Sequence, residues 1–340
     1  MPPYFIFSIC FLITFTTVPL VIAIANNSGA IANPGKRHIH SDPTPKFGGI
    51  AIAASVLMVS PFIFSVDMVI GSYLASASIM LILGIFDDVK GATWRTKLIF
   101  SLIATSIMIF GADVWIKDIG NLLGTGNIHL GVWGIPLTFF AVFGIINAIN
   151  LIDGLNGLAC GLTSIAFLSF AILASISGND TVFFLSIANL GATLGLFKYN
   201  YPKARIFMGD SGSLYLGFSL AMLSIMITQG PVAVDPMLPV IILGIPIIDT
   251  LRVMGVRMKN KKHPFRADKT HLHHLMIRSG IPLSRVVKTI WLLAAFMSFL
   301  AFALNTSESW LMFIIFVITA AFIGVFIENL RIIKTSASKK

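Results

Sequence analysis

Roughly eleven apolar runs, most of them near twenty residues long, follow one another along this 340-residue chain. A helix needs about 20 mostly apolar residues to cross a bilayer. Backbone polar groups in lipid must be paired internally, so runs this long favour helices over a barrel. The predicted spans cover residues 4–25, 48–65, 68–86, 98–113, 135–150, 157–177, 182–197, 213–229, 237–255, 288–305 and 309–330. We therefore expect an all-α polytopic integral membrane protein, with residues 1–340 forming one membrane-embedded domain.

The basic residues are concentrated in alternate loops, on one side of the predicted membrane. These loops cover residues 26–47, 87–97, 151–156, 198–212 and 256–287, followed by the tail 331–340. Of the 24 Lys and Arg residues, only Lys117 lies outside these loops and the adjoining span ends. The positive-inside rule places this side in the cytoplasm, the N-terminus in the periplasm and the C-terminus in the cytoplasm. Membrane orientation thus accounts for the net charge of +10, and we expect no nucleic-acid partner.

Two adjacent carboxylates, Asp87 and Asp88, follow the predicted span 68–86. Like charges side by side either raise the pKa of one carboxylate, which can then serve as a base, or face a cation together. Arg95 and Lys97 come later in the same loop and supply positive charge. The alternative is an acidic helix end solvated by headgroup water.

Amide and carboxylate oxygens interrupt the apolar sequence at two further places. Asn147, Asn150 and Asp153 follow one another at three-residue spacing, which puts them near one face of a helix that Gly154 ends. Such oxygens suit Mg²⁺, whereas the alternative is hydrogen bonding between helices. Asp210, in a glycine-rich segment before another span, either caps that helix or binds a metal.

Two loops combine cations with prolines or histidines. The loop at 34–49 includes Lys46 among cations that can hold phosphate, and topogenic charge is its alternative role. The loop at 256–287 contains three histidines in four residues, His271, His273 and His274, beside several cations. They suit a pyrophosphate; zinc or anionic lipid are the alternatives.

Taken together, these motifs resemble the polyprenyl-phosphate N-acetylhexosamine-1-phosphate transferase superfamily, glycosyltransferase family 4. The resemblance spans about residues 33–280. The matching segments are Thr44–Gly49, Phe86–Asp88, Asn147–Gly157, Gly209–Ser213 and Pro246–Thr250. The stretch His271-Leu272-His273-His274 is similar to the His-Ile-His-His motif of the WecA/TagO-like branch, from which Leu272 departs.

The resemblance implies transfer of N-acetylglucosamine 1-phosphate from UDP-GlcNAc to undecaprenyl phosphate, with release of UMP. This would be the first membrane step of O-antigen, enterobacterial common antigen or a related glycan, at the cytoplasmic side of the inner membrane. It implies Mg²⁺, for which Mn²⁺ can substitute. The site residues that it implies are Asn150 and Asp210 as metal ligands, Asp87, Asp88 and Asp153 in catalysis, Lys46 and Lys97 near phosphates, Asn156 near uridine, and Arg266, His271, His273 and His274 over the donor. Asn156 stands where many bacterial relatives carry Asp.

The sequence leaves alternative substrates and functions open. Another UDP-N-acetylhexosamine, such as a 6-deoxy sugar, would satisfy the same motifs. A transporter would place its carboxylates near the bilayer midplane and show internal repeats, whereas these acids lie at span ends and no repeat is visible. The sequence does not fix the oligomeric state, and a homodimer is among the alternatives.

Overall fold

The structure is a computed structural model that describes residues 1–32, 43–259, 261 and 270–337, with side chains through residue 326. The described residues are mostly α-helical, and their only strands are the antiparallel pair β1 (Ile31–Ala32) and β2 (Thr44–Pro45). The chain forms two compact units, residues 1–118 with 130–234 and residues 119–129 with 235–340. Each unit is described by itself.

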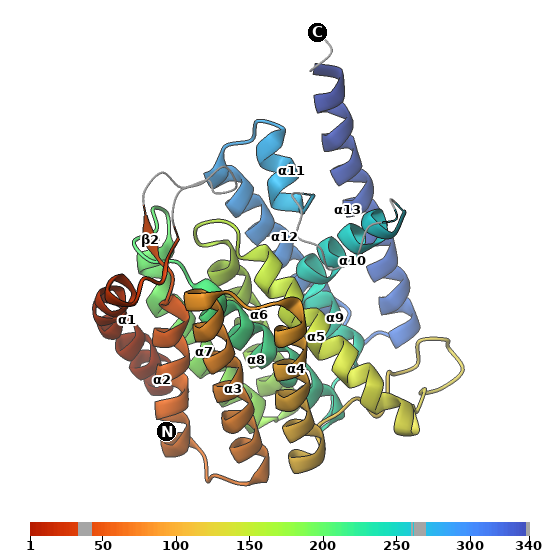
Figure 1. The fold of residues 1–340 in the computed structure, drawn as a ribbon. Helices are drawn as coiled ribbons and strands as arrows, with labels where there is room; N and C mark the ends of the chain where they lie inside the picture. The colour runs from red at the N-terminus through yellow and green to blue at the C-terminus, as the bar shows by residue number, and fades with distance from the viewer. Residues whose placement is uncertain (33–42, 260, 262–269, 338–340) are drawn as a thin grey trace. The chain divides into compact units, whose positions relative to one another are not determined.

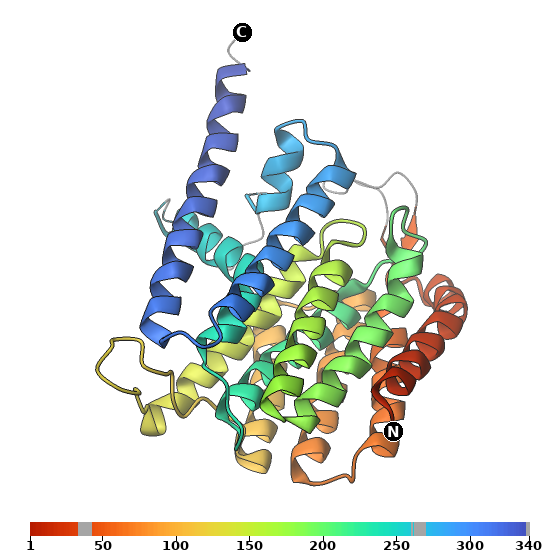
Figure 2. The same ribbon diagram turned by 180° about the vertical axis from the view of Figure 1, so that it is seen from behind.

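The first unit is a helical bundle (Figures 1 and 2). In chain order its helices are α1 (Pro3–Ser28), α2 (Gly48–Ile63), α3 (Met68–Lys90), α4 (Trp94–Ser106) with the π-helical turn η1 (Ile107–Gly111), the 3-10 turn η2 (Gly131–Trp133), α5 (Gly134–Ile152), α6 (Leu158–Ser177), α7 (Asp180–Asn200) and α8 (Gly209–Gln229). Figure 1 shows α2, α3 and α4 side by side, and Figure 2 shows α6 beside α7.

Helix α8 is the centre of this unit. Every residue from Ser211 to Ile227 is buried, and α2, α3, α5, α6 and α7 all pack against the helix. Its side chains include many small residues, which let neighbouring backbones approach closely, as is common where helices pack in membranes. The beginning of α8 is therefore held from several sides at once.

Glycines make the closest of these approaches. A Cβ atom built on Gly49 of α2 would lie 1.9 Å from the backbone nitrogen of Gly212, and one on Gly84 of α3 would lie 2.3 Å from Cα of Ser211. On α8 itself, a Cβ atom on Gly217 would meet Cα of Ile146 at 2.8 Å. No side chain fits at these contacts, so glycine sets the distance from α8 to α2, α3 and α5.

The second unit contains the remaining helices. They are α9 (Met237–Ile242), α10 (Gly244–Lys259), α11 (Leu272–Arg278), α12 (Leu283–Ala303) and α13 (Ser309–Ala337). Within this unit α12 packs against α9, α10 and α11, and α13 contacts α9, α10 and α11. The segment 119–129 joins the unit through Asn121, whose backbone amide donates to Oγ of Ser309 at 3.0 Å.

The predicted all-α membrane architecture is confirmed. Among the described residues, nine helices are long and apolar enough to cross a membrane, and α2 is a shorter apolar helix. The predicted span 237–255 is not one continuous helix, because the chain breaks at Leu243 between α9 and α10. Pro239 and Pro246 lack the amide hydrogens needed for an unbroken helical ladder, and Gly244 begins the second helix.

Candidate active site

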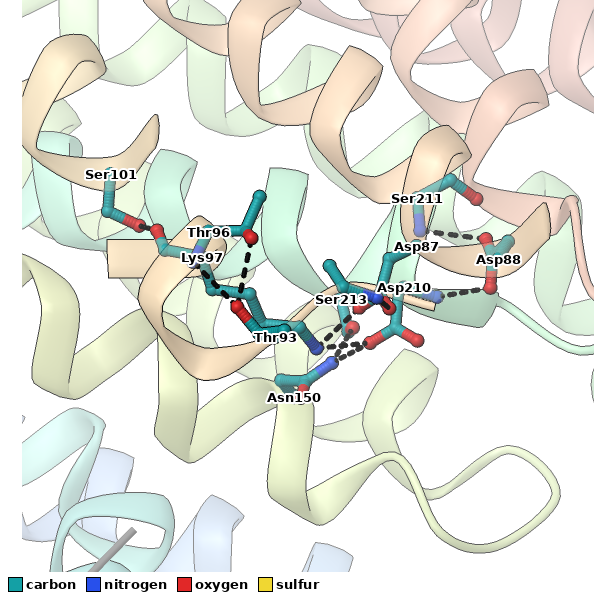
Figure 3. Close-up of polar contacts among 11 residues, drawn as sticks. Asp87, Asp88, Thr93, Thr96, Lys97, Ser101, Asn150, Asp210, Ser211 and Ser213 are labelled. Carbon is teal, nitrogen blue, oxygen red and sulfur yellow. Dashed lines mark hydrogen bonds and ion pairs between the residues drawn. The ribbon is translucent and has the colours of Figure 1, made fainter. Parts of the chain in front are cut away.

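Four helix ends of the first unit meet at one place (Figure 3). These are the C-terminal ends of α3 and α5 and the N-terminal ends of α4 and α8. They bring together five of the residues predicted for the site: Asp87 and Asp88 from α3, Lys97 from α4, Asn150 from α5 and Asp210 from α8. Carboxylate, amide and ammonium groups from four helices therefore converge at one place.

Lys97 lies between two carboxylates. Its Nζ atom is 2.5 Å from Oδ2 of Asp87 and 3.2 Å from Oδ1 of Asp210. The side chain of Asp87 is 8% exposed and that of Lys97 is 17% exposed, so this ion pair is screened much less than a surface pair. The lysine thus joins the end of α3 to the beginning of α8 electrostatically.

A tight turn between α3 and α4 brings Lys97 to this position. Helix α3 ends at Gly91, whose φ of +76° is in the left-handed region that glycine adopts freely. The backbone amide of Ala92 donates to Oδ1 of Asp87 at 2.5 Å, and Thr93 caps α4 by accepting from the amide of Thr96 at 3.2 Å. Asp87 is consequently held at both oxygens, by the Ala92 amide and by the Lys97 ammonium.

Asn150 contributes an amide group from α5. Its Nδ2 atom donates to Oδ1 of Asp210 and, at 2.8 Å, to Oγ of Ser213. In this orientation Asn150 supports Asp210 through hydrogen bonds, and its amide must turn over before its oxygen can bind a cation. Ser213 ends the segment Gly209–Ser213 identified from the sequence, which gives no sign of this contact.

Asp88 holds the first turn of α8. Its Oδ1 atom accepts from the backbone amide of Asp210 and its Oδ2 atom from that of Ser211, both at 2.9 Å. The residue is 4% exposed, and both carboxylate oxygens are occupied. A buried carboxylate at a helix N-terminus satisfies unpaired amides and complements the helix dipole. Asp88 thus differs from Asp87, although the two are adjacent in sequence.

Gly209 makes this arrangement sterically feasible. Its φ is +72°, and a Cβ atom there would lie 2.2 Å from the carbonyl oxygen of Lys46 and 2.6 Å from Oδ2 of Asp88. The contact places the backbone of Lys46 beside the beginning of α8. A glycine at this point allows Asp88 to reach the amides that follow it.

Asp153, just after the end of α5, is half-buried. Burial, together with the negative charges of Asp210 and Asp88, raises the pKa of Asp153 to about 8. Without a cation nearby, this carboxyl is therefore mostly protonated at neutral pH. Its interaction with Asp210 and Asp88 makes it sensitive to any change of charge at the cluster.

The loop after Asp153 is held by a residue that sequence reasoning missed. Oδ1 of Asn200, at the end of α7, accepts from the backbone amide of Gly157 at 2.8 Å, and its Nδ2 donates to the carbonyl of Ile206 at 2.9 Å. Asn156 lies in this loop and donates to the carbonyl of Pro202 at 3.3 Å. The sequence offered one signal for Asn200: it is a polar residue that follows an apolar run and precedes Tyr201-Pro202.

The side chains present at the cluster are suited to a divalent cation. The cluster contains three carboxylates, those of Asp87, Asp88 and Asp210, and one ammonium group, that of Lys97, so negative charge is in excess. Within the described part of the chain, no three His, Cys, Asp or Glu residues form a preformed ligand set. Mg²⁺ does not need one, because it typically keeps waters and takes one or two carboxylates beside substrate phosphates.

The predicted histidines lie next to one another in the second unit. Nδ1 of His271 lies 2.8 Å from Oδ2 of Asp249, whose Oδ1 accepts from Nη2 of Arg252 at 3.0 Å. Burial alone would raise the pKa of Asp249, but the hydrogen bond and charge of His271, together with Arg252, hold it below its usual value. Burial lowers the pKa of His273 to about 3, and the charge of His274 contributes. Arg266 lies outside the described residues.

The fold and the cluster together define a class: a polytopic helical membrane protein with a buried acidic cluster at the ends of its helices. Comparisons with known proteins agree with this class. The profile of glycosyl transferase family 4 matches residues 70–228, which include all five clustered residues.

Relatives match over nearly the whole chain. A "probable undecaprenyl-phosphate N-acetylglucosaminyl 1-phosphate transferase" of Bacillus subtilis is 34% identical over 91% of this chain and 88% of its own length. A "decaprenyl-phosphate N-acetylglucosaminephosphotransferase" of Mycolicibacterium smegmatis is 32% identical, over 85% and 78% respectively. An "undecaprenyl-phosphate alpha-N-acetylglucosaminyl 1-phosphate transferase" of Escherichia coli K12 is 27% identical over 93% of this chain and 89% of its own length. The chain therefore belongs to glycosyl transferase family 4, the family of polyprenyl-phosphate hexosamine-1-phosphate transferases that its motifs resemble.

Proposed function

We propose that this protein transfers N-acetylglucosamine 1-phosphate from UDP-N-acetylglucosamine to undecaprenyl phosphate and releases UMP. An oxygen of the lipid phosphate attacks the phosphorus that carries the sugar. The bond to the UMP phosphate breaks, and UMP leaves with the electron pair. The observation that carries the proposal is the cluster of Asp87, Lys97 and Asp210 at membrane-helix ends in a chain of this family. The names of the relatives support the sugar and the acceptor.

The chemistry of phosphoryl transfer fits this cluster. Such a transfer depends on positioning and charge neutralisation more than on covalent help from the protein. Lys97 supplies a fixed positive charge between two carboxylates. Asp87, held by Lys97 and by the Ala92 amide, is our candidate for accepting a proton from the lipid phosphate or orienting its attack. Asp88 supports the reaction by holding the first turn of α8.

A divalent cation, Mg²⁺ by our proposal, would be held by Asp210 and Asn150. When bound, such an ion neutralises charge on the pyrophosphate and on departing UMP. Asp210 stands at the first turn of α8, where its backbone is held by Asp88 and its side chain by Asn150 and Lys97. These contacts orient Asp210 before any substrate arrives.

The remaining predicted residues extend the proposal to the donor. We infer that Asn156 lies near the uridine and that Asp153 belongs to the donor side of the cluster. We place Lys46, with Arg266, among the groups for phosphate, and His271, His273 and His274 over phosphate and sugar. The charge asymmetry of the loops supports a site facing the cytoplasm of the inner membrane.

A transfer assay tests the proposal directly. Purified protein is incubated with undecaprenyl phosphate and one of three radiolabelled donors, UDP-GlcNAc, UDP-GalNAc or a UDP-6-deoxy-N-acetylhexosamine, with and without EDTA. We expect label in the lipid fraction from UDP-GlcNAc, loss of transfer with EDTA, and recovery with Mg²⁺ or Mn²⁺. Label in lipid from none of the donors would refute the function, and transfer from only another sugar would refute the donor.

Two variants test the assigned residues in the same assay. Asp87→Asn and Asp210→Asn should each abolish UMP release while the protein still inserts into the membrane. Asp113→Asn is the matched control, because Asp113 also pairs with a lysine, Lys117, at 2.6 Å, but its side chain is 75% exposed. Full activity in either cluster variant would remove the corresponding assignment.

A further inference from the structure

Asp249 and His271 form a buried pair in the second unit, and a purely structural role does not explain its geometry. Asp249 is 3% exposed and His271 is also 3% exposed. Oδ2 of Asp249 contacts Nδ1 of His271, and Oδ1 accepts both from the backbone amide of Leu272 at 2.9 Å and from Arg252. The carboxylate therefore has three partners, and one oxygen is used for the imidazole alone.

The other ring nitrogen of His271 has no hydrogen-bond partner among the residues that the structure describes. Buried polar atoms in proteins are nearly always hydrogen-bonded, and a buried atom without a partner calls for an explanation. Because Nδ1 is committed to Asp249, any contact between His271 and a substrate must use Nε2. One nitrogen is thus fixed and the other is left available.

We propose that Asp249 is a positioning residue for His271: it keeps one ring proton on Nδ1, so that Nε2 can carry a second proton and contact a phosphate of the donor as a cation. The inference rests on the proposed function and deepens it. A carboxylate on one imidazole nitrogen fixes the tautomer and orientation of the ring. A cationic contact from Nε2 to a donor phosphate needs one event: Nε2 gains a proton from water while Nδ1–H stays on the carboxylate.

Asp249→Asn reverses this arrangement with little change of shape. The single amide oxygen must replace Oδ1, which serves the Leu272 amide and Arg252. The NH₂ group then faces Nδ1, so Nδ1 becomes the acceptor and the ring proton moves to Nε2. The ring can no longer become cationic, because a second proton on Nδ1 would point at the NH₂ group. We expect kcat/KM for UDP-GlcNAc to fall about 10- to 100-fold, the usual effect of losing such a partner.

His271→Asn separates the function of Nε2 from the structural contact. The Asn amide can donate to Asp249 in place of Nδ1–H, so the carboxylate keeps its partner while Nε2 is absent. We expect the same 10- to 100-fold loss, with thermal unfolding in detergent within a few degrees of the wild type. Asp235→Asn is the control in the same unit, because Asp235 accepts from the Met237 amide at 2.8 Å and contacts no histidine. Its activity should stay within about twofold.

The double variant completes the test. If Asp249 acts through His271, the combination of Asp249→Asn and His271→Asn should be no worse than either change alone, because coupled residues are not additive. Full activity of His271→Asn, or losses that multiply in the double variant, would overturn the inference. If Asp249→Asn fails to fold, His271→Asn decides alone. A wild type that releases no UMP refutes the proposed function and this inference with it, whereas an active wild type with fully active His271→Asn refutes only the inference.

Discussion

Replacing Asp88 with Asn would release one of the two amides at the beginning of α8 while keeping the size of the side chain. The carboxylate accepts from the Asp210 and Ser211 amides, each at 2.9 Å, in a site that is 4% exposed. Asparagine offers one oxygen, so its NH₂ group must face a backbone N–H. Two buried donors then point at each other, and the negative charge at the helix N-terminus is lost.

The magnitude follows from these contacts. A hydrogen bond to a charged group contributes about 1.5–3 kcal/mol, and an anion at a helix N-terminus contributes about 0.3–1 kcal/mol more. The combined loss is about 2–4 kcal/mol. It lowers the equilibrium ratio of the first turn of α8 with its amides bound to residue 88 over the turn without these bonds by about 30- to 1,000-fold. Asp210 is in that turn, so the variant should bind the divalent cation more weakly.

The assay is UMP release over a wide range of Mg²⁺ concentration. For Asp88→Asn we expect a large rise in the Mg²⁺ concentration needed for half-maximal activity. UMP release should partly recover at high Mg²⁺, because ion binding favours the ordered first turn of α8. Asp87→Asn should stay inactive at every concentration. Asp67→Asn is the matched control: Asp67 caps α3 by accepting from the Ile70 amide at 2.8 Å, is exposed, and Asn caps equally well. Wild-type Mg²⁺ dependence in Asp88→Asn would refute the reasoning.

Three further predictions concern other parts of the first unit. Gly84→Ala should cost about 1–3 kcal/mol of stability, seen as a lower unfolding temperature in detergent, because the new methyl group meets the α8 backbone; Gly71→Ala on the same helix, whose Cβ meets only Val66 at 3.8 Å, should change little. Lys97→Gln should lower kcat about 100- to 1,000-fold in the UMP assay, whereas exposed Lys90→Gln should stay near wild type. The raised pKa of Asp153, about 8 against 3.8 when unfolded, means that the folded state holds a proton that the unfolded chain loses, so metal-free stability should fall as pH rises from about 4 to 8. Asp153→Asn should flatten that slope in thermal unfolding, and an unchanged slope would count against the assignment.

The helices of the first unit were predictable from hydropathy because each long apolar run became one helix. The break at Leu243 was not predicted, because a hydropathy window averages over Pro239, Gly244 and Pro246. The beginning of α8 was placed four residues too late, at 213 instead of 209. Polar Asp210 and Ser211 looked like loop residues, and the carboxylate that makes their amides helical lies in α3, more than a hundred residues earlier.

The cluster was predictable for a different reason. Asp87, Lys97 and Asp210 stood in loops assigned to one face by charge, and Asn150 ended a predicted span on the same face, so their proximity followed from topology. The different contacts of Asp87 and Asp88 did not follow from the sequence. Neighbouring residues on a helix point in different directions, and their partners come from distant segments. The contact between Asp249 and His271 was missed for the same reason: it joins positions 22 residues apart through a fold that spacing does not specify.

The glycine contacts around α8 affect how substitutions in this chain should be interpreted. Replacement by alanine is normally chosen as the mildest change, since it deletes atoms and leaves the backbone alone. At Gly49 and Gly84 the same replacement adds a methyl group where another backbone already lies. A scan that scores alanine as neutral would therefore overlook the least tolerant positions of the bundle, and their variants would be mistaken for losses of chemistry.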